Sequence, residues 1–203
     1  MPTGPSRSLH PRVVTASMGP LAGFGLARGD IRIVPYDPGW VEAFREVRVR
    51  LRKILPSARI EHVGSTAVPG SEAKPIVDVS VGLAPGTRLG IDAARSIGLE
   101  FRSVSPESAH FVFRDHKGRH VVHVHVNPRD SEAELGLLRF RDFLRSHPDV
   151  VQEYGRVKHR ILATARYRRR YTEAKSPFIR RLGPRVRRWA IRTGWIPGRT
   201  QRG

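Results

Sequence analysis

The sequence predicts an α+β fold: a mixed sheet covered mainly on one side by helices. Strand-like and helical segments do not alternate regularly: a strand and a helix come first, a run of short strands with one small helix among them follows, and several helices come last. Apolar residues recur every second position in the strand-like segments and every three or four positions in the helical ones. At 203 residues, the chain is long enough for one hydrophobic core and short for two full-sized domains.

Residues 31–83 are predicted to form one helix and several short strands. Residues 31–34 resemble a strand, and a turn follows at residues 36–39. A helix is predicted over residues 39–55, and Pro56 ends it. The apolar residues of this segment recur at helical spacing: Trp40, Phe44, Val47, Leu51 and Leu55. We expect strands at residues 60–63 and 76–83, joined by a loop at 64–75.

The second half contains more strands and then helices only. A short helix is predicted at residues 88–97. Three strands are expected next, the last two as a hairpin: residues 99–104, 110–114 and 120–127. Three helices are expected after them: residues 131–147, 148 to about 171, and a very basic one at 175–190.

Composition sets limits on class and compartment. The absence of cysteine excludes disulfides, thiolate metal sites and a cysteine nucleophile, and it is consistent with a reducing cytoplasm. No apolar run approaches the roughly 18 residues of a membrane span. We therefore expect a soluble cytoplasmic protein without a membrane span. The formal charge is +19, and residues 156–203 hold 16 Lys and Arg against one acid. Such a basic segment attracts polyanions, including RNA.

These patterns predict three regions. Residues 1–29 are rich in Gly, Pro, Ser and Ala without periodicity, so we expect a disordered leader there. Residues 30–183 form the expected domain, and residues 184–203 a basic C-terminal tail.

The loop at 64–75 carries the first candidate site. A Gly-Ser turn after a strand can direct backbone N–H groups at an anion, so Gly64, Ser65 and the hydroxyl of Thr66 are candidate phosphate ligands. Lys74 stands just before the next strand and can reach a phosphate oxygen. Asp78, on the polar face of that strand, can hold a divalent cation beside the same phosphate. The alternative is an ordinary strand-ending turn with a surface acid.

The segment His120-Val-Val-His-Val-His-Val126 alternates with period two. It places His123 and His125 on one face together with Val121, and the opposite face is apolar. If both strands turn their apolar faces to one core, these imidazoles share a face with Asp78. Such a set suits Mn, Fe, Ni or Zn better than Mg, which prefers oxygen ligands. The alternative is the solvent face of a half-buried strand.

Several blocks, in this order, resemble one known family: IRIVPYDPGW, IEHVGSTAVPG, AKPIVDV, HVHV, FRDFLRSHP and YTEAKSPFI. They resemble the GrpB family over about residues 31–182, and this resemblance implies a fold of the nucleotidyltransferase superfamily. In that superfamily a Gly-Ser turn precedes an Asp-x-Asp or Asp-x-Glu pair. Gly64 and Ser65 match the turn and Asp78 the first acid, whereas Ser80 occupies the place of the second.

The resemblance implies a protein that binds a nucleotide or similar phosphate compound with a divalent cation, Mg or Mn or another transition metal. If it is an enzyme, it transfers a nucleotidyl group to an acceptor that the sequence does not identify. Asp78, His123 and His125 are then the candidate catalytic and metal-binding residues, and Lys175, within a family-like block, approaches the substrate. The alternative is an inactive fold that acts as an RNA-binding or adaptor protein through its Arg-rich C-terminus.

Overall fold

The computed structural model describes residues 21, 23–105, 108–164 and 170–198. Their strands are β1 (Arg59–Val63), β2 (Val77–Leu83), β3 (Glu100–Val104), β4 (Ala109–Arg114) and β5 (His120–Pro128). They form one sheet in the order β1-β2-β5-β4-β3. Strands β2 and β5 are parallel, and the other neighbours are antiparallel, so the predicted α+β class with a mixed sheet is confirmed.

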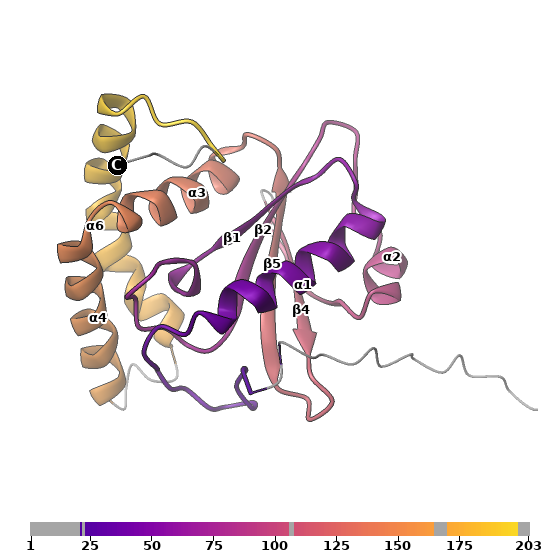
Figure 1. The fold of residues 1–203 in the computed structure, drawn as a ribbon, viewed down its shortest axis with the longest axis horizontal. Helices are drawn as coiled ribbons and strands as arrows, with labels where there is room; N and C mark the ends of the chain where they lie inside the picture. Colours follow the sequence, from indigo (N-terminus) through magenta and orange to yellow (C-terminus); the bar gives the residue numbers. More distant parts are fainter. Residues whose placement is uncertain (1–20, 22, 106–107, 165–169, 199–203) are drawn as a thin grey trace, which may run out of the picture.

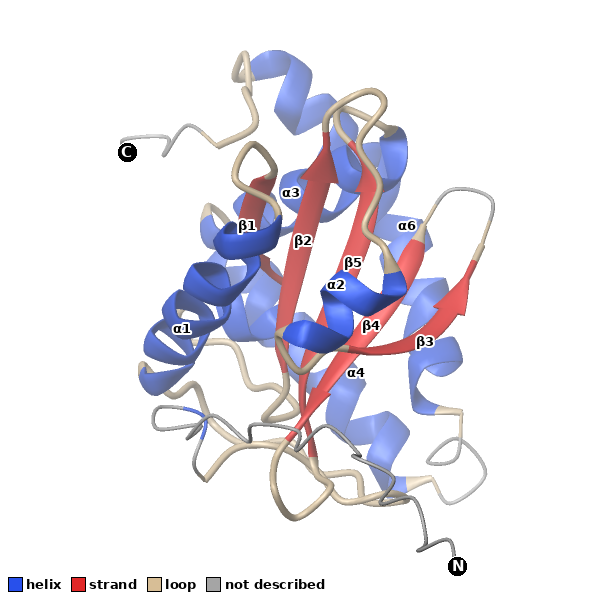
Figure 2. Cartoon of the chain, turned by 90° about the vertical axis from the view of Figure 1, so that its right-hand side faces the viewer, coloured by secondary structure: helices blue, strands red, loops and turns tan. Residues whose placement is uncertain are grey.

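The helices divide between the two faces of the sheet, rather than gathering mainly on one. They are α1 (Gly39–Ile54), α2 (Ile91–Ser96), α3 (Glu132–Arg145), α4 (Pro148–Ala163) and α6 (Tyr171–Arg192), with a short 3-10 turn η2 (Ser65–Ala67). Helices α1 and α2 cover one face (Figure 2). Helix α3 packs on β1, β2 and β5 from the other side, and α4 and α6 pack against it (Figure 1).

The main core lies between α1 and the sheet. Val77, Val79 and Val81 turn to this side, where they meet Trp40 and Leu51 of α1. The period-two pattern of β2 therefore sends its apolar face to α1 and its polar face, with Asp78, to α3. A second cluster joins α3, α4 and α6 to Val68, which directly follows η2. The Gly64–Ser65 turn therefore lies between the main core and this second cluster.

An irregularity at the beginning of β5 changes the predicted side-chain pattern. Phe113 pairs with Val122, but Arg114 pairs with His120, so Val121 lies opposite no residue of β4. Val121 is fully buried in the α1 core, although the sequence placed it on the face of His123. The ring of His120 in turn lies 5.8 Å from that of His123, between centroids.

Several boundaries differ from the expectation. Residues 31–34 form no named strand, and Val34 makes only an isolated bridge to Ala73. Leu21 and Leu26, in the expected leader, are buried, and Leu26 forms an isolated bridge to His120. Residues 1–20 and 22 lie outside the described residues. Among the later helices, α4 ends at Ala163, and α6 continues through the expected domain boundary at 183/184.

Within the described ranges, no helix is both long and apolar enough to cross a membrane.

Candidate functional site

The Gly64–Ser65 turn lies directly against Asp78. Gly64 follows β1 with a φ of 71°, in the left-handed region. A Cβ atom at this position would lie 2.5 Å from Oδ2 of Asp78, closer than real Cβ contacts come. Only glycine satisfies both the backbone and this approach. The structure therefore brings together two predicted site residues that are 14 positions apart.

The two hydroxyl residues of the turn have different surroundings. Ser65 is half-buried, and its Oγ lies 3.3 Å from the ammonium of Lys158. Thr66 is only 1% exposed, and its hydroxyl bonds Nε2 of His62 at 3.0 Å. The His62 ring stacks on Phe44 of α1, and burial lowers the pKa of His62 to about 3. Thr66 thus supports the turn from the core side, whereas Ser65 faces the charged groups.

Asp78 meets two imidazoles from the neighbouring parallel strand. Its Oδ1 lies 3.3 Å from His125 Nε2 and 3.6 Å from His123 Nδ1. Burial acts to raise the pKa of Asp78, but the approach of the His123 and His125 rings lowers it far below its ordinary value. The three predicted catalytic and metal-binding residues therefore form one cluster, in which Asp78 stays ionised.

A third imidazole completes this cluster from β4. His110 pairs directly with His125 across the antiparallel β4–β5 ladder, and therefore points to the same face. One nitrogen from each of His110, His123 and His125 lies within 4.8 Å of the others. Burial lowers the pKa of His110, and the charges of His125 and His123 lower it further. Grouped imidazoles are suitable ligands for a transition metal.

On the other side of the turn, α4 contributes a buried cation. Lys158 is 2% exposed, and its ammonium donates to the carbonyl of Glu72 and lies 3.4 Å from the hydroxyl of Ser71. It also lies 4.5 Å from the ring centroid of Tyr154. Burial lowers the pKa of Lys158 to about 8, assisted by repulsion from Lys175 and opposed by Glu72.

The predicted lysines lie beside it. The ammonium groups of Lys74 and Lys175 lie 4.2 and 4.9 Å from the ring centroid of Tyr171, so both lie at the beginning of α6. Burial lowers the pKa of Lys74 to about 8, together with repulsion from Lys175, while Asp78 acts to raise it. Burial also lowers the pKa of Lys175, again opposed by Asp78. The three ammonium groups thus share one partly desolvated region next to Asp78.

Two arginine side chains near the turn are bonded to other groups of the protein. Arg145 donates to the carbonyl of Ala67 at 2.8 and 3.0 Å, and Arg141 is buried and paired with Glu61 at 2.8 Å. Ser80, in the place of the second acid, is 1% exposed and its hydroxyl has no hydrogen-bond partner among the described residues. Among the described residues, Asp78 is the carboxylate that lies against the Gly64–Ser65 turn.

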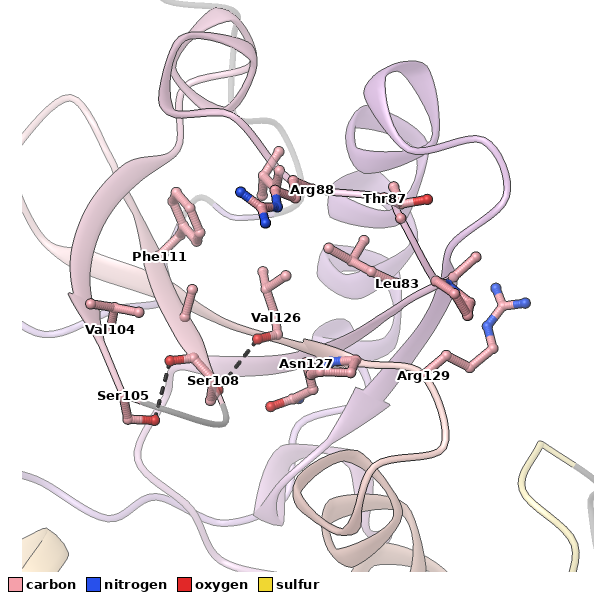
Figure 3. Close-up of a pocket in the computed structure, with 16 residues that line it drawn as sticks. Leu83, Thr87, Arg88, Val104, Ser105, Ser108, Phe111, Val126, Asn127 and Arg129 are labelled. Carbon is pink, nitrogen blue, oxygen red and sulfur yellow. Dashed lines mark hydrogen bonds between the residues drawn. The ribbon is translucent and has the colours of Figure 1, made fainter.

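A cavity of about 580 Å³ lies elsewhere, at the carboxyl ends of β2 and β5 (Figure 3). Leu83, Phe111 and Val126 contribute apolar walls. Its serine hydroxyls are already engaged, since that of Ser108 donates to the carbonyl of Val126 at 3.4 Å and that of Ser105 to the carbonyl of Ser108 at 3.2 Å. None of the predicted site residues lines this cavity.

The sequence of the chain matches those of known proteins. The sequence profile described as GrpB protein matches residues 30–185, most of the chain and nearly the predicted range. The chain belongs to the GrpB family. A UPF0157 protein of Pseudomonas aeruginosa is 37% identical in an alignment of 166 positions, which covers 75% of this chain and 66% of that protein. The chain therefore spans slightly less than two thirds of this relative's length.

Solved structures resemble the fold as well. The crystal structure of the conserved protein GrpB from Enterococcus faecalis matches with a TM-score of 0.63 and 26% identity, over 81% of this GrpB-family chain and 100% of that one. A poly(U) polymerase with MgGTP bound matches at a TM-score of 0.45 and 17% identity, over 63% of this chain and 43% of that one. The latter is a likeness of fold alone.

Proposed function

We propose that this GrpB-family protein binds a phosphate-bearing small molecule, most simply a nucleotide, at the Gly64–Ser65 turn. The observation that carries the proposal is the buried ammonium of Lys158, which contacts Ser65 and two other oxygen groups but no carboxylate among the described residues. A buried cation without a counter-ion is costly. An anion bound at the turn offsets that cost.

Lys74, in the loop before β2, and Lys175, on α6, support the same proposal. Neither forms an ion pair with a carboxylate of the described residues, and both lie over Tyr171. Three ammonium groups against one carboxylate leave the site with excess positive charge, which suits a polyphosphate better than a single carboxylate ligand. Ser65 then adds a hydroxyl donor at the centre of the group.

A divalent cation fits beside the phosphate, on the strand pair that carries Asp78, His123 and His125. When bound, such an ion neutralises phosphate charge. Because Ser80 replaces a second carboxylate, the residues suit one ion rather than two. Asp78 remains anionic, and so balances part of the charge of an ion next to it.

The finer proposal is nucleotidyl transfer. An acceptor hydroxyl would form a bond to the α-phosphorus of a nucleoside triphosphate, the bond to the β-phosphate oxygen would break, and pyrophosphate would leave. His123 or His125 would take the hydroxyl proton only if its ring does not hold the ion; where both rings hold the ion, the proton would pass to solvent water. Lys158, Lys74 and Lys175 would hold the departing phosphates. Incubation with a triphosphate labelled at the α-phosphate, followed by a search for labelled products and released pyrophosphate, tests this step.

Calorimetric titration tests the binding proposal. We expect a panel of nucleoside triphosphates to show saturable binding to the wild-type protein and at least tenfold weaker binding to Lys158→Met. The matched control is Lys53→Met, because Lys53 is exposed on α1, away from the turn. Equal affinity of all three proteins would show that the turn is not the binding site.

One observation favours the second candidate, an RNA-binding or adaptor protein. Arg187, Arg188 and Arg192 are exposed on α6 and form no ion pair with any described residue. Such a surface binds RNA phosphates without sequence preference, and its affinity falls steeply with salt. Residues 165–169, which include part of the Arg-rich segment, lie outside the described residues.

A further inference from the structure

We infer that His110, His123 and His125 form a binding site for a single divalent transition-metal ion, and that Asp78 positions the imidazoles instead of binding the ion. The inference deepens the cation part of the proposed function and rests on that function only for what the ion does beside a phosphate. It differs from the expectation drawn from the sequence, in which Asp78 was a ligand and His110 had no role.

The first argument is geometric. The three candidate ligand nitrogens lie within 4.8 Å of one another, and the ring centroids of His123 and His125 are 4.2 Å apart. The His110 ring lies 5.3 and 5.2 Å from these two. Two nitrogens bound to one tetrahedral ion at about 2.1 Å are separated by about 3.4 Å. Rotations of the side chains that bring the nitrogens together by up to about 1.4 Å would therefore form the site.

The second argument is the set of nitrogens that lack partners. Nε2 of His123 and Nδ1 of His110 are buried and have no hydrogen-bond partner among the described residues. Buried polar atoms without partners are rare and costly, so each requires an explanation. A metal ion accepts the lone pairs of both.

The third argument is the orientation of Asp78. Its Oδ1 lies 3.6 Å from Nδ1 of His123 and 3.3 Å from Nε2 of His125, so it faces one nitrogen of each ring and leaves the other free. A carboxylate that holds the second nitrogen of a metal-binding histidine is a common arrangement and fixes which nitrogen binds the ion. The other oxygen, Oδ2, packs against Gly64, so Asp78 connects the metal site to the turn.

The donor set determines the metal. Three imidazole nitrogens suit Zn²⁺, Ni²⁺, Co²⁺ or Fe²⁺, whereas Mg²⁺ requires oxygen ligands and retains water. The only carboxylate among the described site residues, Asp78, is engaged with the rings. The site should therefore bind Zn²⁺ and Co²⁺ and should ignore Mg²⁺ at millimolar concentration.

The test uses metal alone, without nucleotide. The full chain is stripped with a chelator and titrated with Co²⁺, whose visible absorption reports coordination, and then with Zn²⁺ as competitor and with Mg²⁺. The wild-type protein should bind Co²⁺ and develop a visible absorption spectrum. Added Zn²⁺ should displace the bound Co²⁺ and abolish this spectrum, whereas added Mg²⁺ should leave it unchanged. His110→Gln should bind at least tenfold more weakly with an altered spectrum, and His116→Gln, at an exposed turn position, should behave as wild type.

Asp78→Asn distinguishes the two roles of this residue. A positioning role predicts about 10–100-fold weaker binding with the same type of Co²⁺ spectrum. Unchanged Co²⁺ affinity in His110→Gln, or Mg²⁺ displacing Co²⁺, would overturn the inference. Loss of the spectrum in Asp78→Asn, with its thermal unfolding unchanged, would make Asp78 a ligand and overturn its positioning role. Nucleotide binding measured in chelator remains a separate readout, so failure of the metal site and failure of the phosphate site are distinguishable.

Discussion

Lys158 and Ser65 are in contact although 93 positions separate them: Nζ of the lysine lies 3.3 Å from Oγ of the serine. This contact joins α4 to the turn between β1 and β2. It places a buried cation beside the turn at which we propose that a phosphate binds.

The first prediction concerns the stability cost of Lys158. Its pKa of about 8 means that the folded protein disfavours the charged ammonium relative to the unfolded chain. Lys158→Met removes the cost of burying the ammonium, and the two side chains have similar volumes. The hydrogen bonds that are lost with the ammonium offset only part of the gain in stability. We expect the free energy of unfolding at pH 7 to rise by about 1–2 kcal/mol. Urea unfolding measures this change, and a fall of the same size would identify Lys158 as a structural tie.

The second prediction is that pH changes binding and stability in opposite directions. Lys74 and Lys158 titrate near pH 8 in the folded protein and near 10.5 when unfolded. Between these values the unfolded chain binds more protons, so the stability of the unliganded protein rises as pH increases from 8 to 10. Nucleotide affinity should fall at least about tenfold between pH 7.5 and 9.5, because the lysine charges are lost.

Calorimetry and urea unfolding across this pH range check both effects. In Lys158→Met, both the nucleotide affinity and the free energy of unfolding should change less with pH than in the wild-type protein. Nucleotide affinity that stays constant to pH 9.5 would contradict the assignment of these lysines as phosphate ligands.

The third prediction compares two glycines with similar φ angles. Gly64 and Gly70 have φ of 71° and 75°, but only a Cβ at Gly64 meets another residue, Asp78; nothing lies within 4 Å of one at Gly70. Alanine at Gly70 should cost about 1 kcal/mol of unfolding free energy from backbone strain alone. Alanine at Gly64 should cost clearly more and also weaken nucleotide binding. Equal costs would mean that Asp78 moves away freely.

The fourth prediction concerns acid sensitivity. His62 has a pKa of about 3 in the folded protein because of burial, so the unfolded chain takes up the proton first as pH falls below about 6.5. Stability is therefore lost with falling pH, by up to about 1.4 kcal/mol per pH unit. His62→Leu should show a correspondingly shallower slope between pH 6 and 4 in urea unfolding. His116→Leu, at an exposed position, should keep the wild-type slope.

Much of the site follows from local patterns. Period-two alternation in β2 and β5 placed Asp78, His123 and His125 on one face, and the structure gathers them there. The same rule failed at Val121, because an extra residue against β4 shifts the alternation and no sequence signal marks it.

Other parts depend on contacts between distant segments. Lys158 resembles any basic residue of a helix, and only the packing of α4 against the loop at 71–72 buries it. His110 becomes part of the cluster through the β4–β5 register, which a strand pattern alone does not specify. Leu21 and Leu26 carried no periodicity, and their burial also depends on tertiary packing.

The most direct test of the central claim compares two triple variants in a titration with inorganic triphosphate at low and moderate salt. One replaces Lys74, Lys158 and Lys175 with Met, and the other replaces Arg187, Arg188 and Arg192 with Gln. A phosphate site at the turn predicts saturable binding that the lysine variant loses and the arginine variant retains, with weak salt dependence. Binding that survives in the lysine variant, disappears in the arginine variant and vanishes with salt would contradict it and assign anion binding to the surface of α6.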